Sequence, residues 1–250
     1  MSTPAPKKPI VIRPYLPKDR SQVWAMLDVG FATGPDSPGT VALRRSLFTP
    51  LALASYAGFT LGALAALTTR AVHPRVAFAA AVATVVSAGT PLYMRHGIEK
   101  AFLDFCEQAR QSDMRDIEAY YKTLEEREPA QFLVAVIEAT DGSGEDEVVG
   151  FVGLEHLPSR PSVGRLRRMI VSPYHRRRGI GSRLLDAVVA HARLHAPSPL
   201  EVLELETSTF QPAAQELYKR YGFVQVGTRV IPWGPFRHEL KELKFRLKLV

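Results

Sequence analysis

A basic, glycine-containing turn at residues 176–182 has the residue types of an anion-binding site. It reads Arg-Arg-Arg-Gly-Ile-Gly-Ser and follows a predicted strand that ends at Val171. Glycines let phosphate oxygens approach the backbone, and the N–H groups at the start of the next helix point toward the same spot. The spacing Arg-x-x-Gly-x-Gly therefore predicts a pyrophosphate site, although a solvated basic turn would have the same pattern.

A second segment, 211–223, places a tyrosine where it could take part in chemistry. It reads Gln-Pro-Ala-Ala-Gln-Glu-Leu-Tyr-Lys-Arg-Tyr-Gly-Phe and predicts a helix over 212–221. The small residues Ala213 and Ala214 let this helix pack closely on a ligand, and Tyr218 is expected to project toward the end of the strand before the basic turn. Alone, Tyr218 would be read as a packed core residue. Its position downstream of the basic turn, with a strand between, makes the combination specific.

The two segments together resemble the GNAT acetyltransferase superfamily, over roughly 10–32 and 98–250. The shared pattern is Val-x-Pro-x-x-Arg-Arg-x-Gly-Ile-Gly-x-x-Leu-Leu from Val171, then a strand, then Ala-x-x-x-Tyr-x-x-x-Gly-Phe from Ala214. An apolar insertion after the first helix and the motifs at 112–117, 148–153 and 205–207 are similar to the camello-like group. These are membrane-anchored GNAT enzymes of the endoplasmic reticulum, related to N-acetylaspartate synthase and cysteine-S-conjugate N-acetyltransferase.

The resemblance implies a GNAT fold, which is an α/β fold with a mixed sheet, and acetyl-CoA as co-substrate without a metal. Acetyl-CoA would lie in a V between splayed strands that end at Val171 and Thr207. Tyr218 would protonate the leaving thiolate as general acid. The backbone of Ile170 and Val171 would hold the thioester carbonyl and pantetheine. The remaining implied contacts, most of them to the pyrophosphate, come from Arg176, Arg177, Arg178, Gly179, Ile180, Gly181, Ser182 and Gln211. Many members have Asn where Gln211 stands.

No residue is assigned as general base. Some members of the superfamily have a Glu on the strand before the turn, but the comparable place here is near Arg165, which cannot accept a proton. The nearest alternatives to the inferred cleft are Glu155, His156, Glu204 and Glu206. For each, a solvated position on a strand face is the simpler interpretation. A proton relayed by water, or an amine that arrives neutral, would also suffice.

Several further side chains near the inferred site have two interpretations. If Arg165, Arg167 or Arg168 faces the cleft, an anionic amine becomes a plausible acceptor, but cross-strand pairing with glutamates is the simpler expectation. Trp233 and Phe236, in an expected loop at 231–237, could line the acceptor site or merely cover the core.

Two uncharged stretches predict a membrane hairpin. Residues 47–69 and 76–94 contain no charged residue, and at about 1.5 Å per residue each can cross or nearly cross a hydrocarbon core of roughly 30 Å. The connection 70–75 is short, so the two helices must be antiparallel. The spacing Gly58-x-x-x-Gly62 allows close helix packing. A buried soluble hairpin and a re-entrant hairpin are the alternatives.

The charges around the hairpin predict its orientation. Arg44 and Arg45 precede it and Arg95 and Lys100 follow it, whereas the loop carries Arg70 and Arg75. The further basic residues Lys18 and Arg20 lie upstream, so the excess favours both termini in the cytosol. The expected location is the endoplasmic reticulum membrane with the catalytic domain cytosolic.

The chain divides into four expected parts. These are a disordered N-terminus at 1–8, a first strand and helix at 9–46, the hairpin at 47–94 and the main GNAT domain at 95–250. Strands are expected at 10–13, 131–139, 148–157, 165–171, 202–207, 223–230 and 243–250. Helices are expected at 17–27, 99–110, 114–127, 179–195 and 212–221. A loop is expected at 30–40, a turn at 141–144 and a helix cap at Ser112-Asp113.

Composition narrows the function classes. The single cysteine, Cys106, excludes an internal disulfide and a multi-thiolate metal site. The net charge of +7 fits nucleic acid, anionic lipid or an anionic ligand, but the basic turn accounts for part of it, and no basic platform interleaved with aromatic residues favours nucleic acid. The sequence predicts a membrane-anchored N-acetyltransferase that acts on a small amino acid, a conjugate or a protein amine. The alternative is a non-catalytic membrane regulator or scaffold that binds acyl-CoA.

Overall fold

The computed structural model describes residues 9–122, 130–139, 145–156, 158–194, 199–233 and 238–249. Three predictions lie outside these ranges: the N-terminal segment 1–8, the turn at 141–144 and the position of Phe236. The side chain of Trp233 and the end of the helix predicted over 114–127 also lie outside the description.

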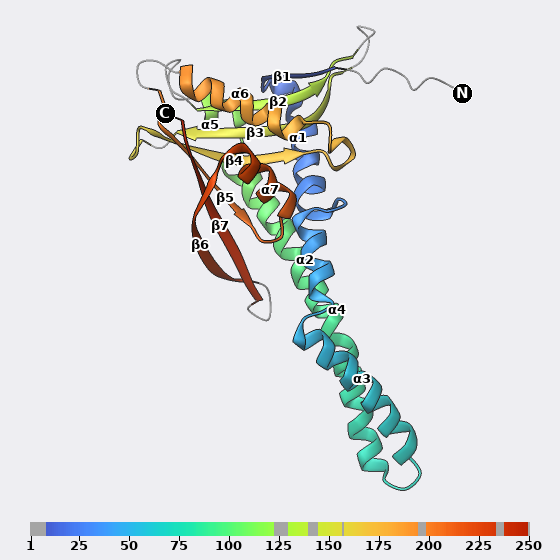
Figure 1. Cartoon of the computed structure of the whole chain (residues 1–250). Coiled ribbons are helices and arrows are strands. Elements are labelled where there is room, and N and C mark those ends of the chain that lie inside the picture. Colours follow the sequence, from blue (N-terminus) through green and yellow to red (C-terminus); the bar gives the residue numbers. More distant parts are fainter. Residues whose placement is uncertain are drawn as a thin grey trace, which may run out of the picture.

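A seven-stranded mixed sheet forms the centre of the domain (Figure 1). Its order is β1-β2-β3-β4-β5-β7-β6, and all neighbours pair antiparallel except β4 and β5. The strands are β1 (Ile10–Pro14), β2 (Gln131–Ile137), β3 (Glu147–His156), β4 (Val163–Val171), β5 (Val202–Ser208), β6 (Val224–Trp233) and β7 (His238–Lys248). This arrangement confirms the predicted mixed α/β fold.

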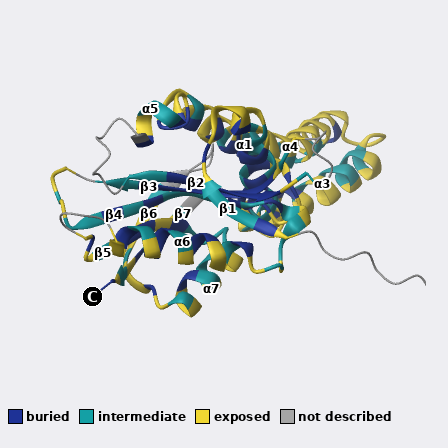
Figure 2. Cartoon of the chain, turned by 90° about the horizontal axis from the view of Figure 1, so that it is seen from above, coloured by how far each residue is buried: buried dark blue, intermediate teal, exposed yellow. Residues whose placement is uncertain are grey.

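Helices cover both faces of the sheet (Figure 2). On one face lie α6 and α7, and on the other lie α1, α5 and one end of α4. The helices are α1 (Arg20–Leu27), α2 (Pro38–Ser46), α3 (Pro50–Thr69), α4 (Pro74–Gln111), α5 (Ile117–Lys122), α6 (Ile180–Leu194) and α7 (Pro212–Tyr221). Two short 3-10 helices, η1 (Pro17–Asp19) and η3 (Pro173–His175), and a π-helix, η2 (Asp28–Thr33), complete the described elements.

Each face of the sheet has its own apolar core. Because side chains alternate along a strand, β2 sends Leu133 and Ala135 to the α6 side and Phe132 and Val134 to the α1 side, and all four are buried. The predicted inner face of α6 is also buried, at Ile180, Leu184, Val188 and Ala192. A strand that is buried on both faces needs a near-continuous run of apolar residues. The sequence of β2 is such a run.

Glu204 on β5 is a buried carboxylate that pairs with three partly exposed cations, so the expectation of a solvated strand-face residue is wrong. Its side chain is 2% exposed. Its carboxylate oxygens lie 2.9 Å from Arg160 Nη2, 2.9 Å from Lys244 Nζ and 2.7 Å from Arg246 Nη2. Burial alone would raise the pKa of Glu204, but hydrogen bonds from the three cations outweigh it and lower the pKa to about 2. The cluster links β5 to β7 and to the segment before β4.

Helices α3 and α4 form an antiparallel hairpin that projects away from the sheet (Figure 1). Both are long and apolar enough to cross a membrane by length and composition, and their most apolar 18-residue windows are 11% and 6% buried. A Cβ added to Gly58 would lie 2.7 Å from Ser87 Oγ, and one added to Gly62 would lie 2.6 Å from Thr84 Oγ1. The two glycines therefore permit close helix packing, as their spacing predicts.

The segment 30–40, expected as a loop, is largely helical. The π-helix η2 covers 28–33, and α2 begins at Pro38. Ser37 makes this possible, because its hydroxyl accepts a hydrogen bond from Thr40 N and donates one to Ala32 O. The Ser37 hydroxyl thus joins η2 to the first turn of α2. Glycine and proline content alone does not reveal such a contact.

The second apolar helix also extends further than expected. α4 runs unbroken from the hairpin loop to Gln111 and includes the segment 99–110 that was predicted as a separate helix. Pro91 lies inside it and removes one backbone hydrogen bond without ending the helix. The cap of α5 is Asp116, whose carboxylate accepts from Ala119 N at 2.9 Å, and not the predicted pair Ser112-Asp113.

Replacing Glu204 by Gln is expected to destabilise the domain by about 2 kcal/mol, because a buried carboxylate that accepts hydrogen bonds from three cations becomes a neutral amide. Since the pKa of Glu204 is depressed in the folded state, its stabilisation is complete above its ordinary pKa of 4.5 and is lost as the pH falls toward about 2. Thermal unfolding of the detergent-solubilised chain at pH 7 and between pH 5 and 2 measures both effects. Glu206→Gln, an exposed glutamate of the same strand, is the control. Equal Tm values for the two variants would contradict the prediction.

Candidate active site

A V-shaped opening separates β4 from β5. The two strands pair from Val163 to Leu166 on β4 and from Val202 to Leu205 on β5, and then part. β4 stays with β3 as far as Val171, while β5 stays with β7 as far as Ser208. The facing edges beyond Leu166 therefore present backbone donors and acceptors to whatever lies between them, as an extended ligand with amide groups requires.

A bulge in β4 sets the direction of the side chains beside this opening. Gly153 pairs with Arg167 but Phe151 pairs with Ile170, so Arg168 and Met169 together face one residue of β3. Arg168 has a φ of 55°, in the left-handed region. An extra residue in one strand shifts the alternation of side chains for the rest of that strand.

The basic turn has the backbone of an anion site. Arg177 has a φ of 60° and Gly179 a φ of 74°, and α6 begins at the next residue, Ile180. The first N–H groups of a helix lack partners within the helix and face its N-terminal end. A Cβ at Gly179 would meet nothing within 4 Å, so the turn is open at this point. Open space, free donors and a positive helix end together suit a phosphate.

Some residues predicted to touch the pyrophosphate have another contact in the structure. Arg176 Nη1 donates to Pro35 O at 3.2 Å and so holds the turn to the segment before α2. A Cβ at Gly181 would lie 2.8 Å from Leu217 Cδ2, so this glycine lets α6 and α7 pack closely. Arg177 is exposed at the turn. Ser182 lies in the first turn of α6.

Tyr218 reaches from α7 toward β4, as predicted. Its hydroxyl lies 3.6 Å from Met169 Sδ, beside the bulge. The residue is 7% exposed, and its ring packs on Phe223 and Phe245. Burial raises the pKa of the Tyr218 phenol well above its ordinary value of 10. A thioether is a weak acceptor, so the phenolic proton is retained at neutral pH and is available to a stronger acceptor.

Gln211 is engaged with the end of β5. Its Oε1 accepts hydrogen bonds from Thr207 Oγ1 at 3.1 Å and from Ser208 N at 3.2 Å. The side chain therefore shapes the turn that leads from β5 into α7.

Three of the four alternatives for a general base lie at the closed end of the V. Glu155 and His156 stand opposite Arg165 and Gly164, before the strands part. Glu155 pairs with Arg167 at 3.1 Å and Arg165 at 3.7 Å, which is the cross-strand pairing expected for these arginines. Desolvation and a hydrogen bond to Glu155 raise the pKa of Tyr120 to about 12.

The other three base candidates differ from Glu155 and from one another. His156 Nε2 lies 3.0 Å from Pro161 O, and Glu204 is held by its three cations. Glu206 is the one of the four that lies past Leu205, where the strands have parted, and it is exposed.

The wall of the opening nearest the hairpin comes from elements that the sequence did not predict. A Cβ at Gly30 in η2 would lie 2.3 Å from Ile170 Cγ2, so the absence of a side chain lets η2 rest on β4. Arg45 on α2 donates to Thr209 O at 3.0 Å and lies over the ring of Phe210. These contacts bring the chain that leads into the hairpin to the ends of both diverging strands.

A buried acidic group also went unrecognised as part of this region. Asp113 follows α4 and is 1% exposed, and its carboxylate binds Arg168 at the bulge through two hydrogen bonds of 2.6 and 3.0 Å. The resemblance of residues 112–117 to a family motif was the available signal for Asp113. The local sequence favoured a helix cap and did not indicate an ion pair with Arg168, 55 residues away.

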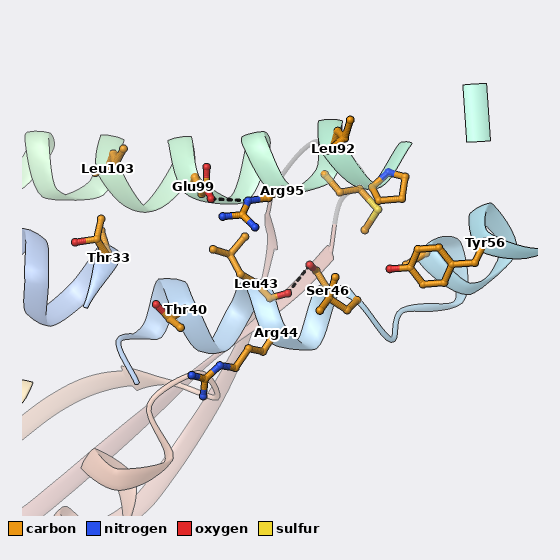
Figure 3. A pocket seen from close by; sticks show the side chains of 15 residues that line it. Thr33, Thr40, Leu43, Arg44, Ser46, Tyr56, Leu92, Arg95, Glu99 and Leu103 are labelled. Atoms are coloured by element: carbon orange, nitrogen blue, oxygen red, sulfur yellow. Dashed lines mark hydrogen bonds and ion pairs between the residues drawn. The ribbon is translucent and has the colours of Figure 1, made fainter. Parts of the chain in front are cut away.

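A cavity of about 620 Å³ opens between α2, the beginning of α3 and the middle of α4 (Figure 3). Arg95 extends from α4 toward Leu43 and Ser46 on α2, and Leu92 and Tyr56 lie on the hairpin side. The described lining residues come from 32–56 and 91–103, and none belongs to β4, β5, α6 or α7. The cavity thus lies at the base of the hairpin and is separate from the V.

Known proteins share this sequence pattern and this fold. A family model described as "Acetyltransferase (GNAT) family" matches residues 95–223. The chain is 32% identical over 152 residues to an N-acetylaspartate synthetase of Danio rerio, covering 60% of this chain and 49% of that protein. It is 33% identical over 137 residues to a probable N-acetyltransferase camello of Xenopus tropicalis, covering 55% and 53%. The chain therefore spans about half the length of these curated relatives.

A solved structure shares the fold. An N-acetyltransferase from Staphylococcus aureus Mu50 matches with a TM-score of 0.51 and 13% identity, covering 97% of this chain and 99% of that chain. At this identity the likeness shows the fold alone. The family match covers more than half of the 250 residues, and it includes the basic turn and Tyr218. This chain therefore belongs to the acetyltransferase (GNAT) family.

Proposed function

We propose that this protein is a membrane-anchored N-acetyltransferase that moves acetyl from acetyl-CoA to a primary amine by direct attack. The observation that carries the proposal is the V between β4 and β5, with the open basic turn beside it and the buried Tyr218 hydroxyl directed at β4. GNAT enzymes use acetyl-CoA, and these three features match the three parts of that molecule: pantetheine, pyrophosphate and thioester.

Binding is divided between the two ends of the opening. The N–H groups at 179–182 and the positive end of α6 hold the pyrophosphate, and Arg177 and Arg178 add charge. The backbone edge of β4 at Ile170 and Val171 pairs with the pantetheine amides and orients the thioester carbonyl. Gln211 supports this arrangement by keeping the turn after β5 in place.

The chemistry needs one proton donor. The nitrogen of the acceptor attacks the thioester carbon, a C–N bond forms and the C–S bond breaks. Tyr218 donates its phenolic proton to the departing sulfur and regains a proton from solvent. The proton lost by the amine leaves through water, for which the exposed Glu206 beside the opening is a relay. Direct transfer of this kind requires no covalent enzyme intermediate.

The acceptor class is a primary amine: a small amino acid, a conjugate or a protein amine. A relative named N-acetylaspartate synthetase supports the first of these. Arg165 and Arg167 both pair with Glu155. Because this carboxylate offsets their charge, they attract an anionic acceptor only weakly.

The exposed surface of the hairpin supports a membrane anchor. Leu61, Leu67 and Val85 are 66%, 68% and 71% exposed. Soluble proteins rarely expose a continuous apolar surface of this extent, whereas a bilayer would cover it. We place the hairpin in the endoplasmic reticulum membrane, with Arg44, Arg45 and Arg95 on the cytosolic side together with the catalytic domain.

Gly179→Val is expected to weaken acetyl-CoA binding at least tenfold, because a β-branched residue disfavours a φ of 74° and the donors of the turn move. The matched control is Gly89→Val, since a Cβ at Gly89 also meets nothing within 4 Å but its φ is not in the left-handed region. Isothermal titration calorimetry measures both affinities. No acetyl-CoA binding by the unmodified chain would refute the proposed function itself.

Tyr218→Phe is expected to lower kcat about a hundredfold with less than a threefold change in acetyl-CoA affinity, because the proton donor is lost and the ring remains. Release of free thiol from acetyl-CoA and calorimetry measure the two quantities. Tyr221→Phe is the control, because its hydroxyl bonds Asp186 on the outside of the same helix pair. A large loss of affinity in Tyr218→Phe, or an equal loss of kcat in both variants, would argue against the acid role.

Cysteine labelling is expected to place the hairpin loop across the membrane from the catalytic domain. Cys106 is buried, and desolvation raises its thiol pKa to about 12, so the native chain gives little background. In intact microsomes, Glu201→Cys should react with an impermeant maleimide, whereas Ala71→Cys should react only after permeabilisation. Labelling of both positions in intact microsomes would contradict a spanning hairpin and favour a re-entrant one.

A further inference from the structure

The Asp113 carboxylate makes a buried, two-pronged contact with the bulge of β4. Its oxygens accept from Arg168 Nη2 at 2.6 Å and Arg168 Nε at 3.0 Å, and Tyr121 donates its hydroxyl at 3.1 Å. Burial alone would raise the pKa of Asp113, but the hydrogen bonds and charge of Arg168 outweigh it and lower the pKa. Asp113 is therefore an ionised, fully occupied anchor at the end of α4.

Arg168 holds a backbone conformation that its own residue type does not favour. A φ of 55° is strained for a residue with a side chain, whereas glycine adopts it freely. The Arg168 guanidinium also lies 5.3 Å from the ring centre of Phe105 on α4. The contacts with Phe105 on α4 and with Asp113 just after that helix thus hold this side chain on one face of the sheet and offset the backbone strain.

The bulge determines which β4 side chains face α7 and which face η2. Arg167 and Arg168 both point toward Asp113, so the following residues are shifted by one position in the alternation. Met169 consequently meets Tyr218, and Ile170 meets Gly30. A regular strand would exchange these two directions, because a one-residue slip sends each side chain to the opposite face.

The occupied state of Arg168 argues against a direct role in acceptor binding. Its side chain is 10% exposed, and the Nε–Nη2 edge of its guanidinium is taken by Asp113. Glu155, on the neighbouring strand β3, pairs with Arg167 at 3.1 Å. What Arg168 contributes to the site is its backbone geometry.

We propose that Asp113 is a positioning residue for acetyl transfer: by binding Arg168 it holds the β4 bulge that sets the thioester opposite the Tyr218 hydroxyl. This proposal rests on the proposed function, because it takes the edge of β4 beside Tyr218 as the place of reaction. Asp113 itself touches neither the acceptor nor the thioester, and it acts through the φ of Arg168.

Four variants of the full chain in detergent test this role. Asp113→Asn and Arg168→Ala should each lower kcat at least tenfold, with less than a threefold change in acetyl-CoA affinity, because the basic turn still binds the pyrophosphate. The double variant Asp113→Asn with Arg168→Gly should recover most of the lost kcat. Glycine adopts the required φ without an anchor, and no buried charge is left unpaired. Asp116→Asn, which alters only the cap of α5, is the matched control.

Rescue by glycine is the result that a merely structural role would not give. If the double variant is as slow as Arg168→Ala, or if Asp113→Asn is no slower than Asp116→Asn, the proposal is overturned. Circular dichroism and Tm of each variant identify any that fail to fold. If a single variant does not fold, the kcat of the double variant tests the proposal.

A second readout separates this proposal from the proposed function. Amide hydrogen exchange over 163–171 should rise in Asp113→Asn and fall back in the double variant, whether or not an acceptor is turned over. Unchanged exchange in Asp113→Asn would refute the link between Asp113 and the bulge. A wild-type chain that transfers no acetyl group, but shows the expected exchange, would instead refute the proposed function.

Discussion

The site depends on the limited pairing between β4 and β5. Each strand has two edges, and each keeps its antiparallel partner on the outer edge as far as its last residue. The inner edges pair over only four residues of each strand. From there on, backbone groups that would normally be satisfied within a sheet face one another across a gap. The remaining elements of the site either keep that gap open or supply a side chain at its border.

The two ends of the gap differ in their electrostatics. The basic turn is exposed and has a positive helix end behind it, so it suits a ligand group that keeps its charge. Tyr218 lies among Phe223 and Phe245, where desolvation keeps the phenol neutral. Under the proposed function, the charged pyrophosphate is bound where water is present, and the proton is donated where water is scarce. One sheet can provide both because α6 and α7 pack closely at Gly181.

Local signals predicted the parts of the fold that are built from adjacent residues. The helix 212–221 was predicted with its observed bounds, because Pro212 starts it and Gly222, with a φ of 104°, ends it. The direction of Tyr218 followed from a similar signal, the Gly-Phe pair at the end of the same helix. Contacts between distant residues could not be predicted in this way.

The errors share that origin. Glu204 appeared solvated because its cations come from other segments, Arg160 and the strand β7. Asp113 appeared to be a cap because Arg168 is far along the chain. The segment 30–40 appeared to be a loop because its glycines and prolines suit one, whereas Gly30 is needed for packing on Ile170.

The continuity of α4 also determines the height of the site. No hinge interrupts the helix between Arg95, at the foot of the hairpin, and Gln111, next to the Asp113 anchor. At 1.5 Å per residue this stretch is about 25 Å long. With the hairpin in a bilayer as proposed, this continuous stretch of helix holds the diverging strands away from the lipid headgroups. An acceptor must then approach from the aqueous phase, or be carried on a group long enough to span that distance.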